Sequence, residues 1–161
     1  MCRMEKLLIF TLSDLRCALQ LSDIERILIA VAISPVPKAP NIVMGLINVH
    51  GRIVPVLNIR TLLRLPEIEM TLNDQIIIVR TASRPVAILV DNVQGVAEFS
   101  EQDIIAPEEL YPGIEYLEGV TKLKDGILSI YNLDRFLSSE EKAEIEHLLT
   151  GDTSMPADWE I

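Results

Sequence analysis

The sequence predicts a mainly β protein made of two similar small barrels packed together, with short helices and a longer C-terminal helix. Two observations predict this fold. Short apolar runs recur along the 161 residues and alternate with turn signals rich in Gly, Asn and Asp, as in all-β sandwiches and barrels. The second half of the chain also resembles the first when the sequence is shifted along itself, which is typical of a duplicated unit.

The apolar runs and their bounding turns predict a series of strands. The first hairpin turns at Ser13-Asp14, and the run Ile27–Ile33 is expected to continue its sheet. A tight turn is expected at His50-Gly51. Pro55 cannot donate a ladder hydrogen bond, so its strand is expected at a sheet edge or bulged there. The expected strands are Lys6–Leu12, Arg16–Leu21, Ile27–Ile33, Leu46–His50, Ile53–Asn58, Gln75–Thr81, Pro85–Val90, Val93–Phe99, Leu117–Leu123 and Gly126–Tyr131.

The internal similarity indicates two equivalent halves. A shift of 69 residues places Lys6–Ala30 on Gln75–Phe99 without a gap, so that apolar runs meet apolar runs. A shift of 74 residues likewise places Gly45 on Gly119. The few identities are individually weak, but turns, capping residues and apolar runs match in the same order. We therefore expect the two halves to superpose as barrels.

Four residues are expected to cap helical turns. Ser22 and Asp91 coincide in the repeat, and each is followed three positions later by Glu or Gln, which is the capping-box arrangement. Asn58 and Asn132 coincide at the other offset and precede short apolar segments, so each is expected to be an N-cap.

The C-terminal part predicts a helix and a tail. A helix is expected over Glu140–Leu149, followed by a mobile tail over residues 150–161, which has no apolar periodicity. Residues 5–149 are expected to form a single domain of two intertwined barrel halves. The long connection Ala106–Glu115 is a candidate contact loop.

Composition excludes several classes of partner. The net charge of −10 repels phosphate backbones, and aromatic residues make up only 4% of the chain, so nucleic acid is not expected to bind. The apolar stretch Leu7–Phe10 is too short for a secretion signal, and no run approaches the roughly 20 residues that span a bilayer. We expect a cytoplasmic protein without direct membrane insertion. Cys17 lies in an apolar alternation and is expected to be a core side chain.

The sequence contains few reactive side chains in arrangements that are typical of enzymes. No nucleophile elbow, P-loop or Cys/His cluster is present, so no catalytic, cofactor-binding or metal-binding residues are expected. His50 lies in a turn and His147 in a charged segment, and neither has a local partner. A catalytic or ligand-sensing domain would instead require a polar pocket that holds His50 together with carboxylates.

Charge is unevenly distributed along the chain. No Lys or Arg occurs from Pro85 to Thr121, whereas the stretch from Arg16 to Arg64 is mainly basic. Such an arrangement either is a solvated surface or orients complementary partners. Arg26, Arg52 and Arg60 are candidates to pair with carboxylates of a partner, although the simpler interpretation of Arg60 is a solvated side chain.

The run from Gly45 to Arg60, GLINVHGRIVPVLNIR, resembles the signature of the CheW-like domain family. Only His50 departs clearly from that signature, which has Arg at this position. The resemblance extends over Glu5–Leu149. Further similar segments are Leu89–Val93, Tyr116–Val120, Asp125–Ile130 and Leu133–Leu137.

The resemblance implies two SH3-like barrels and a non-enzymatic adaptor. Such adaptors couple the cytoplasmic tips of methyl-accepting chemoreceptors to the regulatory domain of a CheA-type histidine kinase, and they are held at the inner face of the membrane through receptor arrays. It also implies receptor contacts around the His50 turn and the strand Pro85–Val90. The alternative is a divergent CheW-like interaction module with exchanged partners outside motility. The candidate partner-binding residues are Arg26, Asn48, His50, Arg52, Arg60, Val86 and Ile88.

Overall fold

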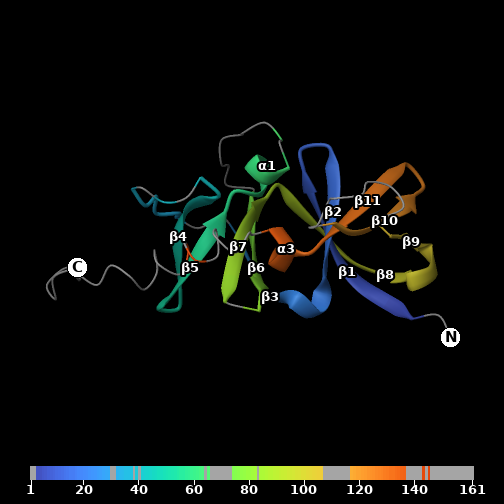
Figure 1. The fold of residues 1–161 in the computed structure, drawn as a ribbon, viewed down its shortest axis with the longest axis horizontal. Coiled ribbons are helices and arrows are strands. Elements are labelled where there is room, and N and C mark those ends of the chain that lie inside the picture. The colour runs from blue at the N-terminus through green and yellow to red at the C-terminus, as the bar shows by residue number, and fades with distance from the viewer. Residues whose placement is uncertain are drawn as a thin grey trace, which may run out of the picture.

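The computed structural model describes residues 3–29, 32–37, 39, 41–63, 65, 74–82, 84–106, 117–136, 143 and 145. Most of them lie in two β-sheets that sit side by side (Figure 1). The elements are β1 (Met4–Leu12), β2 (Leu15–Gln20), η1 (Leu21–Asp23), β3 (Ile24–Ile29), β4 (Val43–Val49), β5 (Arg52–Leu57), α1 (Ile59–Leu62), β6 (Gln75–Arg80), β7 (Pro85–Val90), β8 (Asn92–Ser100), η2 (Glu101–Asp103), β9 (Ile104–Ile105), β10 (Leu117–Leu123), β11 (Gly126–Tyr131) and α3 (Leu133–Phe136).

Each sheet is one SH3-like barrel. The six-stranded barrel has the order β8-β1-β2-β11-β10-β9, and the five-stranded barrel has the order β3-β6-β7-β5-β4. The expected mainly β fold is confirmed, and each expected strand overlaps an observed one. The short strand β9 and the turn η2 were not predicted, because two or three residues carry no detectable periodicity.

The two barrels exchange strands. β3 follows the β1–β2 hairpin in the chain but pairs with β6 of the other barrel, and β8 follows β7 but pairs with β1. The expectation that Ile27–Ile33 continues the first sheet is therefore wrong. The chain leaves that sheet through η1, a connection that strand periodicity alone does not reveal.

The repeat is present at the level of single residues. The ladder between β1 and β8 shifts register at Ile9/Phe10, and the ladder between β6 and β3 shifts at the positions 69 residues later, Ile78 and Val79. Parallel pairing is equivalent as well. Ala18 of β2 lies opposite Ile130 of β11, and Ala87 of β7 lies opposite Val56 of β5.

Gly45 and Gly119 coincide in the repeat because a neighbouring segment passes close to both, at Gly45 through the isolated bridge of Ser34 with Leu46 and at Gly119 through β9. A Cβ atom added to Gly45 would lie 2.5 Å from the carbonyl oxygen of Ser34, and one added to Gly119 would lie 2.5 Å from Cγ2 of Ile104. Ser34 also exchanges two backbone hydrogen bonds with Leu46, of 2.8 and 2.9 Å. The glycines thus allow a crossing segment to approach β4 and β10.

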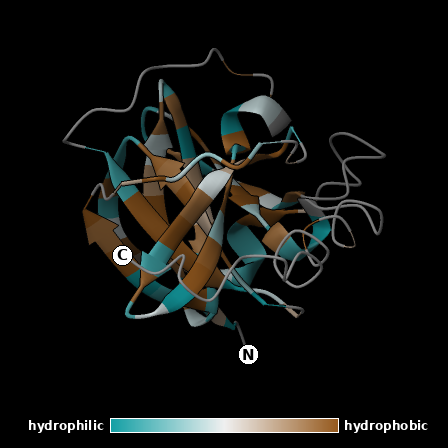
Figure 2. Ribbon diagram, turned by 90° about the vertical axis from the view of Figure 1, so that its left-hand side faces the viewer, coloured by the Kyte–Doolittle hydropathy of each residue, from teal (hydrophilic) through white to brown (hydrophobic). Residues whose placement is uncertain are grey.

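The largest apolar core lies between the barrels. It takes side chains from both hairpins, and Figure 2 shows the hydrophobic residues concentrated on these crossing strands. Each of the two hairpins also packs its other face into a smaller core, so that each barrel contains one such core. The equivalent pairs of the shared core are Leu8 and Ile77, Phe10 and Val79, Cys17 and Val86, and Leu19 and Ile88.

The β4–β5 hairpin turns at His50-Gly51, as expected. Val49 pairs with Arg52, so the loop has two residues. Both have positive φ, 51° for His50 and 84° for Gly51, which defines a type I′ turn. The side-chain oxygen of Asn48 accepts a 2.8 Å hydrogen bond from the amide of Gly51 and fixes the turn.

Pro55 lies neither on an edge strand nor at a bulge, so both expectations for it are wrong. β5 stands between β4 and β7, but its pairing with β7 begins only at Val56. The register shift of this hairpin lies farther along, between Val43 and Gly45 of β4. Proline is tolerated because the ladder with β7 has not yet begun at its position.

Two of the four expected caps are confirmed. The side chain of Asn58 accepts from the amide of Thr61 at 3.2 Å at the start of α1. The side chain of Asn132 accepts from the amide of Asp134 at 2.9 Å before α3. These residues are followed by helical turns, so the propensity of Asn for N-cap positions is realised.

The other two cap assignments are wrong. Ser22 lies inside η1 rather than before it, and Gln20 occupies the N-cap position without a side-chain hydrogen bond. Asp91 precedes the strand β8, where no helix follows. Pairing of β8 with β1 keeps the backbone after Asp91 extended, so its carboxylate is available for a different contact.

Several expectations fall outside the described residues: the mobile tail 150–161, His147, the contact loop beyond Ala106, and most of the helix Glu140–Leu149. Within that last segment Ile145 is described, and it is buried in the core between the barrels.

The close approach at the two glycines predicts a ranked loss of stability. Gly45→Ala drives a methyl group into backbone, which cannot move without breaking its bonds to Leu46, whereas Gly119→Ala first meets a side-chain methyl group of Ile104, and the nearest backbone oxygen is 3.1 Å away. Overpacking of this kind costs about 1–3 kcal/mol, and we expect Gly45→Ala at the upper end. Urea denaturation measures the free energy of unfolding of each variant, with Lys122→Ala at an exposed position of β10 as the control. Equal stability of all three variants would contradict this packing.

Burial predicts that Cys17 is chemically inert. The side chain is fully buried, and desolvation raises the pKa of its thiol to about 12, although the nearby charge of Arg60 lowers it. In a Cys2→Ser variant, iodoacetamide at pH 8 is expected to alkylate Cys17 only after urea unfolds the chain, because the thiolate is the nucleophile. Labelling in native buffer at the rate of a free thiol would disprove this placement.

Candidate functional site

The structure divides the predicted partner-binding residues into two groups. Arg26, Asn48, His50 and Arg52 are exposed on the five-stranded barrel. Arg60, Val86 and Ile88 are buried. The first group is accessible to a partner, and the second is occupied by contacts within the chain.

The exposed group lies at the end of the β4–β5 hairpin and on the adjoining strand β3. Nη2 of Arg52 lies 2.6 Å from Oε1 of Glu25, and this ion pair joins the hairpin to β3. Arg26 follows Glu25 in β3, is exposed, and pairs with no residue that the structure describes. Ile53 adds an apolar side chain that is 48% exposed. We call this set the hairpin surface: Glu25, Arg26, Asn48, His50, Arg52 and Ile53.

The chemistry of the hairpin surface is that of a protein contact. It combines the guanidinium, imidazole, amide and apolar side chains at the end of the β4–β5 hairpin with the guanidinium of Arg26 on β3. Guanidinium groups pair with carboxylates through planar, two-pronged hydrogen bonds. The surface therefore suits a partner that presents carboxylates beside apolar side chains.

Val86 and Ile88 cannot contact a partner, which corrects their assignment as binding residues. Their exposures are 1% and 0%, and both pack in the core between the barrels. β7 stands between β6 and β5, so neighbouring strands flank it on both sides. Its alternating side chains enter the shared core on one face and the core of the five-stranded barrel on the other.

Arg60 is neither solvated nor available to a partner, so both expectations for it are wrong. Its guanidinium forms an ion pair with Asp91 and donates a 2.9 Å hydrogen bond to the hydroxyl of Ser13. Asp91 also accepts a 2.7 Å hydrogen bond from the amide of Ser13. β5 and β7 run parallel, so residues just beyond their ends, Arg60 and Asp91, meet. The sequence alone does not reveal that β5 pairs with β7, so the contact between these two distant residues could not be predicted.

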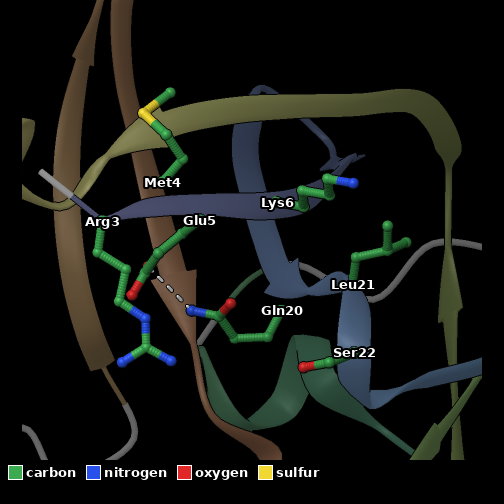
Figure 3. Close-up of a pocket in the computed structure, with 7 residues that line it drawn as sticks. All are labelled: Arg3, Met4, Glu5, Lys6, Gln20, Leu21 and Ser22. Carbon is green, nitrogen blue, oxygen red and sulfur yellow. Dashed lines mark hydrogen bonds between the residues drawn. The ribbon is translucent and has the colours of Figure 1, made fainter.

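Sequence reasoning also missed a polar groove beside η1. Its wider part has a volume of about 630 Å³, and a neighbouring hollow of about 320 Å³ is shown in Figure 3. The amide of Gln20 donates to Glu5 at 3.1 Å and to Glu118 at 3.3 Å, and the amide of Asn132 donates to Glu118 at 3.0 Å. The two carboxylates are thus already engaged by amides.

The alternative of a catalytic pocket around His50 has no support in these contacts. His50 is exposed in its turn, and the groove lies at β1, β2, η1 and α3. Among the described residues, no group of three or more His, Cys, Asp or Glu side chains is placed to hold a metal ion. Within the described ranges, no helix has the length and apolar character that a membrane-spanning helix requires.

Comparison with known proteins agrees with this geometry. The sequence model of the CheW-like domain matches residues 6–141. The "Chemotaxis protein CheW" of Rhizobium meliloti is 30% identical over 68% of this chain and 72% of its own, and that of Treponema pallidum is 24% identical over 89% and 88%.

A solved structure has the same fold. The scaffolding protein TtCheW from Thermoanaerobacter tengcongensis superposes with a TM-score of 0.78, at 24% identity, over 86% of this chain and 96% of its own. The family match spans most of the sequence and includes the β4–β5 hairpin and its flanking strands. The chain belongs to the CheW-like domain family.

Proposed function

We propose that this chain is a non-enzymatic adaptor that couples the cytoplasmic tips of methyl-accepting chemoreceptors to the regulatory domain of a CheA-type histidine kinase. The family membership supports the role of a chemotaxis coupling adaptor. The single observation that carries the more specific proposal is the hairpin surface, because the family signature places its polar residues there, exposed and on a rigid turn.

The receptor is proposed to bind the hairpin surface. Arg26 and Arg52 supply positive charge on a chain whose net charge is −10, so this surface differs in sign from most of the molecule. Charge complementarity between such a surface and its partner steers association and sets the orientation of the complex more than it adds affinity. A receptor tip that presents carboxylates would approach the β4–β5 turn and pack against Ile53.

The kinase regulatory domain is proposed to bind exposed apolar residues at the barrel ends. Val96 of β8 and Ile127 of β11, both on the six-stranded barrel, are 52% and 60% exposed. Neither residue belongs to the hairpin surface, so the two side chains support a second, separate surface. The proposed location is the inner face of the membrane, reached through receptor arrays.

A second candidate is a divergent interaction module with exchanged partners. The observation that favours it is His50, which stands where the family signature has Arg. Imidazole is shorter than guanidinium and cannot clamp a carboxylate through two parallel hydrogen bonds. A weaker or altered receptor contact follows, while the adaptor architecture is unchanged.

A charge reversal tests the receptor surface. Arg26→Glu should weaken binding to a receptor cytoplasmic tip about tenfold, which corresponds to about 1.4 kcal/mol, and should leave binding to the kinase regulatory domain unchanged. Lys122→Glu, an equivalent reversal on exposed β10, is the matched control and should alter neither. Isothermal titration calorimetry measures both affinities. An unchanged receptor affinity for Arg26→Glu would exclude this surface.

The variant His50→Arg separates the two candidate functions in the same assay. Restoring the signature residue should strengthen receptor binding if the turn contacts a receptor carboxylate, because the guanidinium can pair in two-pronged fashion. No receptor binding by either the wild-type chain or His50→Arg would instead favour the divergent module with exchanged partners.

A further inference from the structure

The repeat places two equivalent contacts between the barrels, at opposite ends of their interface. Ser13 at the tip of the β1–β2 hairpin corresponds to Ala82 in the β6–β7 connection, 69 residues later. Arg60 of α1 corresponds to Asp134 of α3, 74 residues later. In each case a short helix of one barrel touches the hairpin tip of the other. Figure 1 shows α1 beside the upper end of the β1–β2 hairpin, with α3 and η1 lower in the view.

The first contact is reinforced threefold. Asp91 accepts from the amide of Ser13 at 2.7 Å, Arg60 donates to the Ser13 hydroxyl at 2.9 Å, and Arg60 and Asp91 form an ion pair. The Arg60 side chain is only 11% exposed. Asp91 is 34% exposed, so the pair is partly buried, and removing either partner leaves a charge without its counter-ion; the contact therefore resists opening. We call it the Arg60 contact.

Among the residues that the structure describes, one hydrogen bond joins the hairpin tip to the helix in the second contact. The amide of Ala82 donates to Oδ1 of Asp134 at 2.8 Å, and Ala82 itself is exposed. Ser22 stands where the repeat would place the counterpart of Asp91, so the position holds no charge to pair with the helix residue. We call it the Asp134 contact.

Asp23 weakens the Asp134 contact further. Burial first and the charge of Asp134 second raise the pKa of the Asp23 carboxyl, while Arg80 lowers it. Two carboxylates thus lie near each other at this end, and the cation beside Asp23 is Arg80, which donates a 3.4 Å hydrogen bond to the carbonyl oxygen of Ser22 rather than forming an ion pair like that of Arg60 with Asp91. The other charged groups along the adjoining groove are Arg3, Glu5, Glu101, Glu118 and Arg135.

We propose that the two barrels are hinged, with the Arg60 contact as the fixed edge and the Asp134 contact as a latch that opens. Both chain crossovers lie at these edges, β7 to β8 at Asp91 and β2 to β3 at η1, so strand exchange permits rotation but prevents separation. The polar groove is lined by Ser22, Asp23 and Arg135 beside the latch. Opening the latch therefore changes the shape of this groove and leaves the hairpin surface intact.

Amide hydrogen exchange of the full chain, followed by NMR, measures how often each of the two contacts opens. After correction for intrinsic rates, Ala82 should exchange at least about tenfold faster than Ser13, because opening of a local contact exposes its amide. Asp134→Ala should remove the protection of Ala82 and leave that of Ser13 unchanged, and Asp134→Asn should restore part of it through the amide oxygen. Equal protection of Ala82 and Ser13 in the wild-type chain would overturn the proposal.

The matched variant Asp23→Asn should act in the opposite direction to Asp134→Ala. Removing the opposing charge should slow exchange of Ala82 at pH 7. The raised pKa of Asp23 means that this difference shrinks as pH falls, because the wild-type carboxyl is then protonated and no longer repels Asp134. Faster exchange of Ala82 in Asp23→Asn would contradict the latch.

Motion of whole barrels is tested by spin labels at Lys122 of the six-stranded barrel and Ile53 of the five-stranded barrel, in a Cys2→Ser background. Pulsed electron resonance should show a broader distance distribution for Asp134→Ala than for the wild-type chain, and a narrower one for Asp23→Asn. Identical distributions in all three proteins would mean that the contact frays locally without hinging the barrels, and would overturn the proposal.

Discussion

Strand exchange is the constraint on which the rest of this structure depends. β3 and β8 each leave the hairpin that precedes them and complete the sheet of the other half. Neither barrel can then form from a continuous half of the chain, and the apolar faces of the two hairpins are brought together. The shared core follows from this exchange, and so does the burial of Val86 and Ile88. Partners are left only the outer surfaces of the molecule.

Much of the fold could be predicted because the repeat and the turns are local signals. The offsets of 69 and 74 residues identified equivalent positions correctly, including Gly45 with Gly119 and Asn58 with Asn132. The exchange itself could not be predicted, since hydrophobic alternation does not say which strand pairs with which. The same limit explains why the assignment of Asp91 as a helix cap is wrong. The pairing of β8 with β1 keeps the following residues extended, whatever the local capping pattern favours.

The candidate site was predictable where it depends on a turn and not where it depends on pairing. His50-Gly51 carries its own signal for a type I′ turn; Arg52 follows it directly, and Asn48 lies two residues before His50. Arg60 was misassigned because its partner Asp91 is reached only through the parallel contact of β5 with β7. The hairpin surface lies on the five-stranded barrel, whereas the exposed apolar side chains Val96 and Ile127 lie on the six-stranded barrel.

The central claim is that one chain holds a receptor tip and a kinase regulatory domain at the same time, on different surfaces. Sedimentation velocity of the three components together tests it most directly. The account predicts a complex that contains all three, with the affinity for each partner unchanged when the other is saturating. Displacement of one partner by the other, or a complex that never exceeds two components, would contradict it.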